Sequence, residues 1–261
     1  MLVKLKRRIP ILLVTLSFLL LSSCGLIRPS EEPKRPEQSK PAKNNQDTQR
    51  KTSQEPKRNG TTNPTKNYTQ EQIDYFLEIT LGAEFGESDP RIRKWTEDLK
   101  IKIMGSPTVE DRRTLNKVVN EVNSIVDGIR LEIGEANPNT EIYFVPESDF
   151  EKFEPNYVPT NYGFFWTWWN SSNGIYKSRI LITTEKVTQT ERSHLIREEL
   201  TQSLGLMKDS QEYQDSVFYQ EWTDTTKYSE IDKAIIEMLY LKEILPNMTR
   251  NEVESVLADR K

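Results

Sequence analysis

The chain of 261 residues contains one cysteine, Cys24, and one histidine, His194. A single cysteine excludes a disulfide within the chain, so an apolar core must hold the fold together. Catalytic zinc usually takes three protein ligands, most often histidines, and one histidine cannot supply them. We therefore expect no cofactor, and zinc least of all.

Long hydrophobic runs are also absent. The longest run, residues 11–21, is shorter than the roughly 20 residues of a membrane-spanning helix. It follows four basic residues and ends in small residues before Cys24, the layout of a bacterial lipoprotein signal peptide. An ordinary signal peptide that happens to contain a cysteine is the alternative. We predict a signal peptide over 1–23 and acylation of Cys24, which would anchor the chain on the outer face of a bacterial membrane.

Residues 24–66 lack aromatic side chains and contain six prolines. Such a segment cannot bury enough apolar area to offset its ordering entropy, so we predict a disordered linker. Its ten Lys/Arg against five Asp/Glu suit an anionic lipid surface or an acidic wall polymer. Plain solubility explains the same charge equally well.

Residues 67–261 carry the remaining net charge of −13, which disfavours nucleic acid as a partner. Their length suits one domain with a substantial core. Hydrophobic periodicity predicts helices over 68–81, 108–133, 190–204, 229–241 and 250–258, and strands over 101–104, 141–145, 164–169 and 179–183. We expect an α/β (α+β) fold, in which a mixed twisted sheet is backed by the long helix and followed by C-terminal helices.

The stretch REELTQSLGL, residues 197–206, resembles the zinc helix of the metzincin metalloproteases, H-E-x-x-H-x-x-G-x-x-H. Glu198 and Gln202 stand at the two helical histidines, and Glu199 stands at the general-base glutamate. Gly205 matches the turning glycine, and Lys208 falls on the third histidine. The resemblance implies a metzincin-like fold with a degenerate site, in which Glu199 is the one candidate catalytic residue.

Segments on both sides extend the resemblance. Residues 215–219 are similar to the metzincin Met-turn with Phe218 in place of the methionine, and residues 228–240 are similar to the closing helix. The chain also resembles a bacterial family catalogued as domain of unknown function 2927, whose members are mostly envelope lipoproteins. The matching residues are Tyr75-Phe76, Gly82 to Gly86, Lys94-Trp95, Arg197 to Gln202 and Asp215-Ser216. This resemblance implies a fold and a location but no mechanism.

Three interpretations of the degenerate helix stay open. His194, Glu198 and Gln202 share one helix face, and their oxygen-rich set would favour Ca²⁺, Mg²⁺ or Mn²⁺ over zinc. Alternatively, Lys208 brings its ammonium to the metal position and pairs with Glu198 or Glu199, with Arg192 and Arg197 as other partners. The third interpretation places both glutamates on a solvated face.

Three tryptophans lie in the predicted strand over 164–169, at Trp166, Trp168 and Trp169. Adjacent side chains of a strand face opposite sides, so both faces would be aromatic. One face would pack on the core, and the other is either buried too or an exposed binding surface. We expect a non-catalytic module that binds an envelope peptide, glycan or protein. The alternatives are a hydrolase that uses Glu199 or a non-zinc metal, and a purely structural lipoprotein.

The lipid anchor gives the first testable prediction. Cys24→Ser removes the acylation site. The variant therefore loses the acyl chains, in which each buried methylene contributes about 0.8 kcal/mol to membrane binding. We expect the variant to leave the membrane fraction, as measured by cell fractionation and intact mass. Ser22→Ala, which keeps a small residue before Cys24, is the matched control and should stay membrane-bound. Equal membrane retention of the two variants would contradict the prediction.

Overall fold

The computed structural model describes residues 2–3, 66–81, 90–154 and 161–261. Cys24, the predicted linker up to residue 65 and nearly all of the predicted signal peptide lie outside the described residues. Within the described ranges, no helix has the length and apolar character needed to cross a bilayer.

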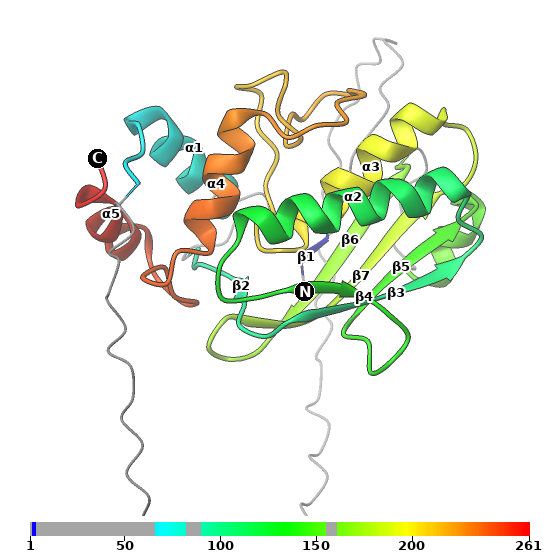
Figure 1. Ribbon diagram of the computed structural model, residues 1–261, viewed down its shortest axis with the longest axis horizontal. Coiled ribbons are helices and arrows are strands. Elements are labelled where there is room, and N and C mark those ends of the chain that lie inside the picture. Colours follow the sequence, from blue (N-terminus) through cyan, green and yellow to red (C-terminus); the bar gives the residue numbers. More distant parts are fainter. Residues whose placement is uncertain (1, 4–65, 82–89, 155–160) are drawn as a thin grey trace, which may run out of the picture. The chain divides into compact units, whose positions relative to one another are not determined.

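A single sheet runs through the domain (Figure 1). Its strands are β1 (Leu2–Val3), β2 (Lys94–Trp95), β3 (Leu99–Gly105), β4 (Leu131–Ile133), β5 (Thr140–Val145), β6 (Gly163–Trp169) and β7 (Gly174–Thr183). The order is β1-β6-β7-β5-β3-β4, and β2 pairs with β7 off this path. The strands β3, β4, β5 and β7 are parallel, whereas β6 is antiparallel to β7 and β1 is antiparallel to β6.

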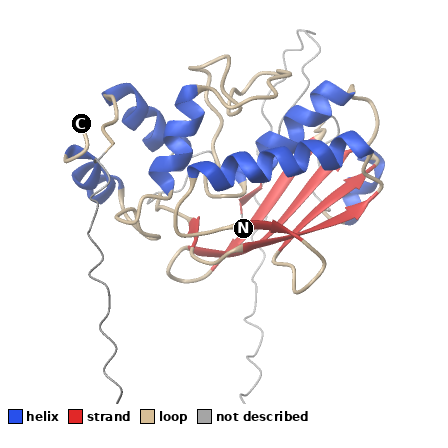
Figure 2. Ribbon diagram, in the orientation of Figure 1, coloured by secondary structure: helices blue, strands red, loops and turns tan. Residues whose placement is uncertain are grey.

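The helices are α1 (Gln70–Leu81), α2 (Val109–Ile125), α3 (Gln189–Gln202), α4 (Glu230–Leu239) and α5 (Arg250–Ala258), with a 3-10 helix η1 at Glu147–Lys152. Helices α2 and α3 cover one face of this sheet (Figure 2). The main core lies between α2, α3 and the sheet and includes Phe144, Phe165 and Ile180. The predicted mixed α/β fold, with a long helix backing the sheet and helices at the C-terminus, is confirmed.

A smaller apolar cluster lies apart from the main core. Phe164 and Trp166 of β6 pack there with Leu181 of β7 and Phe150 of η1. Alternation along β6 explains the division, because Phe165 points to the main core and its neighbours point the other way.

Hydrogen-bonded caps set the start of each helix from α2 onward. Thr108, Thr188, Ser229 and Thr249 each accept a backbone N–H three residues on, and the acidic side chain at that position bonds back. Helix α1 begins in the same way, because Thr69 and Gln72 exchange bonds of 3.0 and 3.2 Å. Helices α1 and α2 thus begin within two residues of their predicted starts.

The predicted C-terminal end of the long helix is wrong. Helix α2 stops at Ile125, and residues 131–133 form β4. Gly128 has φ of +80°, which an α-helix does not allow. The Asn123 side chain then bonds both the N–H and the C=O of Leu131, at 2.8 and 2.9 Å, and fixes the returning strand. Apolar spacing alone does not reveal this side-chain bridge.

Gly205 closes the turn after α3, as the sequence predicts for a glycine at this place. Its φ is +121°, and a Cβ here would lie 2.0 Å from the carbonyl oxygen of Arg93. The glycine therefore allows the chain to pass against the residue before β2.

Gly205→Ala should destabilise the fold by about 1–3 kcal/mol or more, because backbone strain and overlap with Arg93 add together. Gly134→Ala is the matched control, since no heavy atom lies within 4 Å of the added methyl group. Urea unfolding of both variants provides the measurement. Equal midpoints for the two variants would show that Gly205 is not constrained.

Candidate functional site

Helix α3 is buried on every side. All residues from Arg192 to Gln202 are buried, charged ones included. Helix α2, the strands β6 and β7, and the chain that follows α3 surround it. Unpaired charges in such a place cost several kcal/mol, so the partners of each polar group decide what the helix can do.

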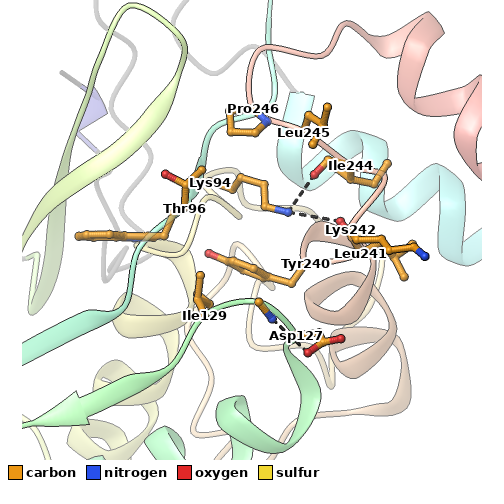
Figure 3. Close-up of a pocket in the computed structure, with 12 residues that line it drawn as sticks. Lys94, Thr96, Asp127, Ile129, Tyr240, Leu241, Lys242, Ile244, Leu245 and Pro246 are labelled. Atoms are coloured by element: carbon orange, nitrogen blue, oxygen red, sulfur yellow. Dashed lines mark hydrogen bonds between the residues drawn. The ribbon is translucent and has the colours of Figure 1, made fainter. Parts of the chain in front are cut away.

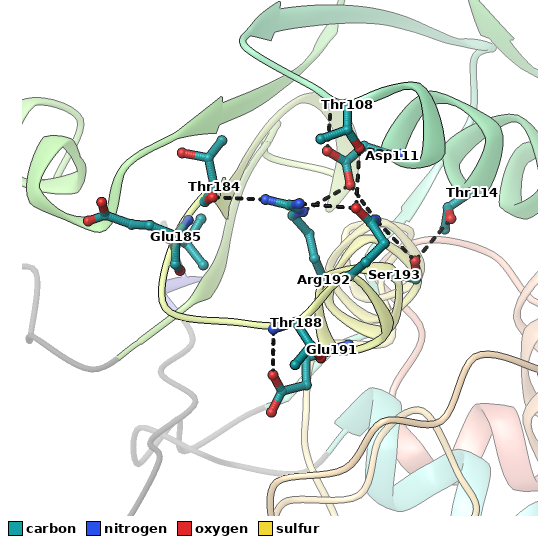
Figure 4. Close-up of polar contacts among 11 residues, drawn as sticks. Thr108, Asp111, Thr114, Thr184, Glu185, Thr188, Glu191, Arg192 and Ser193 are labelled. Atoms are coloured by element: carbon teal, nitrogen blue, oxygen red, sulfur yellow. Dashed lines mark hydrogen bonds and ion pairs between the residues drawn. The ribbon is translucent and has the colours of Figure 1, made fainter.

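A polar cluster joins the start of α3 to the start of α2 (Figure 4). The fully buried Asp111 carboxylate accepts bonds from the Thr108 N–H and the Gln189 amide, each at 2.8 Å. It also pairs with Nε of Arg192 at 3.0 Å. Arg192 in turn donates to the carbonyl of Thr184 at 3.0 Å. Arg192 thus connects both helices to the end of β7.

His194 and Glu198 form a fully buried pair one helical turn apart. Nε2 of His194 lies 3.2 Å from Oε2 of Glu198, and Nδ1 lies 2.7 Å from the carbonyl oxygen of Thr225. A carbonyl only accepts, so Nδ1 carries a hydrogen and donates it. A carboxylate without a polar partner is costly at a position this buried, so His194 stabilises Glu198 there.

Glu199 and Gln202 face different neighbours. Glu199 is 3% exposed, and its Oε1 lies 2.5 Å from the place where a Cβ on Gly163 would be. Gln202 donates to Oδ1 of Asp209 at 3.2 Å, while its Oε1 has no hydrogen-bond partner among the described residues. Glycine at the first position of β6 therefore makes room for Glu199.

Arg197 contacts α2 and the chain before α4. Its guanidinium pairs with Glu121 and lies 4.3 Å from the ring centroid of Tyr228. The Tyr228 hydroxyl shares a 2.6 Å hydrogen bond with Thr201. Burial raises the pKa of Tyr228 to about 12, so this phenol stays neutral at ordinary pH.

The predicted pairing of Lys208 with Glu198 or Glu199 is wrong. Nζ of Lys208 lies 3.4 Å from Glu78 of α1, and the Lys208 N–H bonds the carbonyl of Ile79 at 3.1 Å. Helix α1 lies beside this loop, which the spacing within the motif does not show. The alternative partners, Arg192 and Arg197, pair with Asp111 and Glu121 instead.

The solvated-face interpretation of the two glutamates is wrong as well, since Glu198 is fully buried and Glu199 nearly so. Asp209, which pairs with Gln202, was not among the predicted site residues. The only sequence signal for it is an acidic residue next to Lys208.

A second buried network lies in the segment that resembles the Met-turn. The Asp232 carboxylate accepts bonds from the Ser216 hydroxyl at 2.6 Å and from the N–H groups of Val217 and Ser229. The Tyr75 hydroxyl shares a 2.9 Å bond with Ser216. Burial raises the pKa of Asp232. Asp232 and Tyr75 were missed as site residues, although the S-x-x-D capping pattern marks Asp232.

The residues at the metzincin ligand positions do not fit zinc. The Gln202 amide is a neutral, weak ligand, and the Lys208 ammonium is a cation that pairs with Glu78 of α1. Both ring nitrogens of His194 are engaged. In the part of the chain that the structure describes, no three His, Cys, Asp or Glu residues gather as a metal site would require.

The tryptophans of β6 divide between core and surface. Trp166 is 2% exposed and donates to Glu154 at 3.0 Å, so its prediction as a binding surface is wrong. Trp168 and Trp169 are half-buried. Lys177 lies 5.3 Å from the ring centroid of Trp168, and Arg93 lies 4.2 Å from that of Trp169.

Comparison with known proteins adds a family. The family described as "Protein of unknown function (DUF2927)" matches residues 69–259. No curated protein matches the chain. Two solved structures of myroilysin are similar at 12% identity, with TM-scores of 0.37 and 0.38. The first match covers 57% of this chain and 82% of the myroilysin chain, and the second covers 68% and 99%. A likeness this distant carries no argument about activity.

Glu198→Ala should lower the free energy of unfolding by about 3–5 kcal/mol, because it removes one member of a fully buried ion pair. Glu230→Ala is the matched control, since its carboxylate is exposed and its pair with Lys233 lies on the surface. Guanidinium unfolding followed by tryptophan fluorescence measures both. Similar small changes in the two variants would show that Glu198 has no structural role.

Proposed function

This chain belongs to the family of proteins of unknown function (DUF2927), and from that premise we propose that it is a lipid-anchored bacterial envelope protein that binds an extended partner segment without catalysing a reaction. Acylated Cys24 would hold it at the membrane, and the basic linker would set the reach of the domain. The partner is a protein or peptide.

The edge of β6 is the observation that carries this proposal. Leu2 and Val3 pair there antiparallel, opposite Thr167 and Trp166. If residues 1–23 are removed as a signal peptide, β6 becomes the outermost strand of the sheet. An unpaired strand edge offers main-chain donors and acceptors to an incoming extended segment. The pairing of β1 supports this proposal, because an extended segment already fits antiparallel along β6 there.

Side chains beside this edge favour a particular partner. A paired segment would place alternate side chains on the two faces of the sheet. One face presents Trp168 with Lys177 and Arg179, whose charged groups lie 5.3 and 5.9 Å from the indole centroid. Trp169 lies under Arg93. Aromatic rings next to cations suit a segment with acidic and apolar residues.

The burial of Glu199 favours binding over hydrolysis. A general base must come within hydrogen-bond distance of the proton it removes. Glu199 is 3% exposed and packs against the backbone of Gly163. Its carboxylate is therefore better placed to support the first residue of β6 than to activate water for a substrate.

A synthetic peptide of residues 1–10, with Lys4, Lys6, Arg7 and Arg8 replaced by glutamate to suit the cations beside Trp168, tests the edge on the acylated chain that begins at Cys24. We expect binding with chemical-shift changes at the β6 amides in NMR spectra. Only one of two neighbouring N–H groups of a strand faces its partner. N-methylation should therefore abolish binding at one of the two residues, Leu2 or Val3, and leave it intact at the other. The peptide that still binds is the matched control. No binding, or equal loss with both peptides, would refute strand pairing at β6.

A further inference from the structure

A cavity of about 260 Å³ lies between β2 and the segments that follow α2 and α4 (Figure 3). Its walls are mostly apolar and include Trp95, Ile129, Tyr240 and Pro246, with Leu245 54% exposed. The volume is just below the roughly 300–1,000 Å³ that is typical of ligand pockets in proteins, so it suits a small molecule. No residue of β6 or α3 lines the cavity, so it is separate from the edge that we propose for partner binding.

Lys94 is a lining residue with an unbalanced charge. It is 7% exposed, and its ammonium donates to the carbonyls of Ile244 at 2.9 Å and Leu241 at 3.4 Å. It also lies 4.9 Å from the ring centroid of Tyr240. All three partners are neutral. The Asp127 carboxylate also lines the cavity, but neither it nor any other carboxylate of the described residues forms an ion pair with Lys94. A buried cation normally has an anionic partner.

Hydrogen bonds to the end of α3 hold two walls of the cavity in place. The Trp95 indole donates to the carbonyl of Ser203, and the Tyr240 hydroxyl donates to the carbonyl of Leu204, both at 2.9 Å. Both rings are therefore fixed before any ligand arrives. A fixed apolar site avoids the cost of ordering its side chains upon binding.

We propose that this cavity is a binding site for a small organic monocarboxylate, with its carboxylate on the Lys94 ammonium and its apolar body against Trp95 and Tyr240. One negative charge balances Lys94. Phosphate would bring a second negative charge. Among the described residues that line the cavity, the other cation is Lys242, whose side chain is mostly exposed and lies 3.6 Å from Glu243. The apolar walls favour a ring or branched chain over a purely polar anion.

Protonation of Lys94 makes the site pH-dependent. Burial lowers the pKa of Lys94 from 10.5 to about 8, so the amine loses its charge as pH rises through that value. A bound carboxylate favours the charged amine, and binding is therefore linked to proton uptake. Affinity should fall by about tenfold between pH 7 and pH 9 as the protonated fraction of the free protein falls. The other titratable side chains that line the cavity are Asp127, Lys242 and Tyr240, and burial raises the pKa of Tyr240.

The experiment uses 4-fluorobenzoate as the probe, with fluorine NMR of the purified full-length chain. We expect saturable binding of 4-fluorobenzoate, no comparable binding of the neutral 4-fluorobenzamide, and no competition by inorganic phosphate. Lys94→Met should weaken binding at least tenfold. Lys242→Met, which removes the exposed lysine at the rim, is the matched control and should keep most of the affinity.

Several results would overturn the proposal. Equal binding of the acid and the amide would make the cavity a merely apolar site. Unchanged affinity in Lys94→Met, no pH dependence, or no binding of the acid would each contradict a role for Lys94 as an anion receptor. The comparison of acid with amide needs no variant, so it decides the matter even if Lys94→Met fails to fold. Its outcome is also independent of strand pairing at β6.

Discussion

The burial of α3 on all sides is the constraint on which the rest of the structure depends. A helix with arginine, histidine and glutamate along one buried stretch can exist only if the surrounding chain supplies partners. Helix α2 supplies Asp111 and Glu121, while the segments after α3 supply Asp209 and the carbonyl of Thr225. The path of the chain around α3 therefore follows from the charges that α3 carries.

The same partners explain how residues 203–229, between α3 and α4, are ordered without a regular helix or strand. At Gly205 the chain passes against the backbone of Arg93, and the N–H of Lys208 then bonds the carbonyl of Ile79 in α1. It then reaches the buried carboxylate of Asp232 through Ser216 and Val217. Polar contacts, rather than helices or strands, fix these loops. A motif that resembles a metal site thus serves as the centre of a hydrogen-bonded frame.

Local signals in the sequence predicted most of the fold. The capping pairs at Thr69 and Thr108 and the alternating strands are properties of a few neighbouring residues, so single-sequence patterns reveal them. Strand β4 was missed because its position depends on a bridge from Asn123 to Leu131, not on apolar spacing. Short strands such as β2 have no periodicity to detect.

The candidate site was harder to predict for a physical reason. The motif placed Glu198, Gln202 and His194 together on one helix face, and the structure agrees that His194 and Glu198 touch. Lys208 was misplaced because its partner, Glu78, lies 130 residues away in the chain. Partners of buried charges are set by tertiary packing, which spacing within one motif does not encode.

The structural role of α3 is central, because its polar residues hold the fold together at the positions where the zinc helix that its sequence resembles holds a metal. Its most direct test is the metal content of the purified, tag-free chain, measured by inductively coupled plasma mass spectrometry. We expect no metal in stoichiometric amount, because Glu198 and Gln202 already bind His194 and Asp209. A stoichiometric metal that is lost in both Glu198→Ala and Gln202→Ala would contradict it.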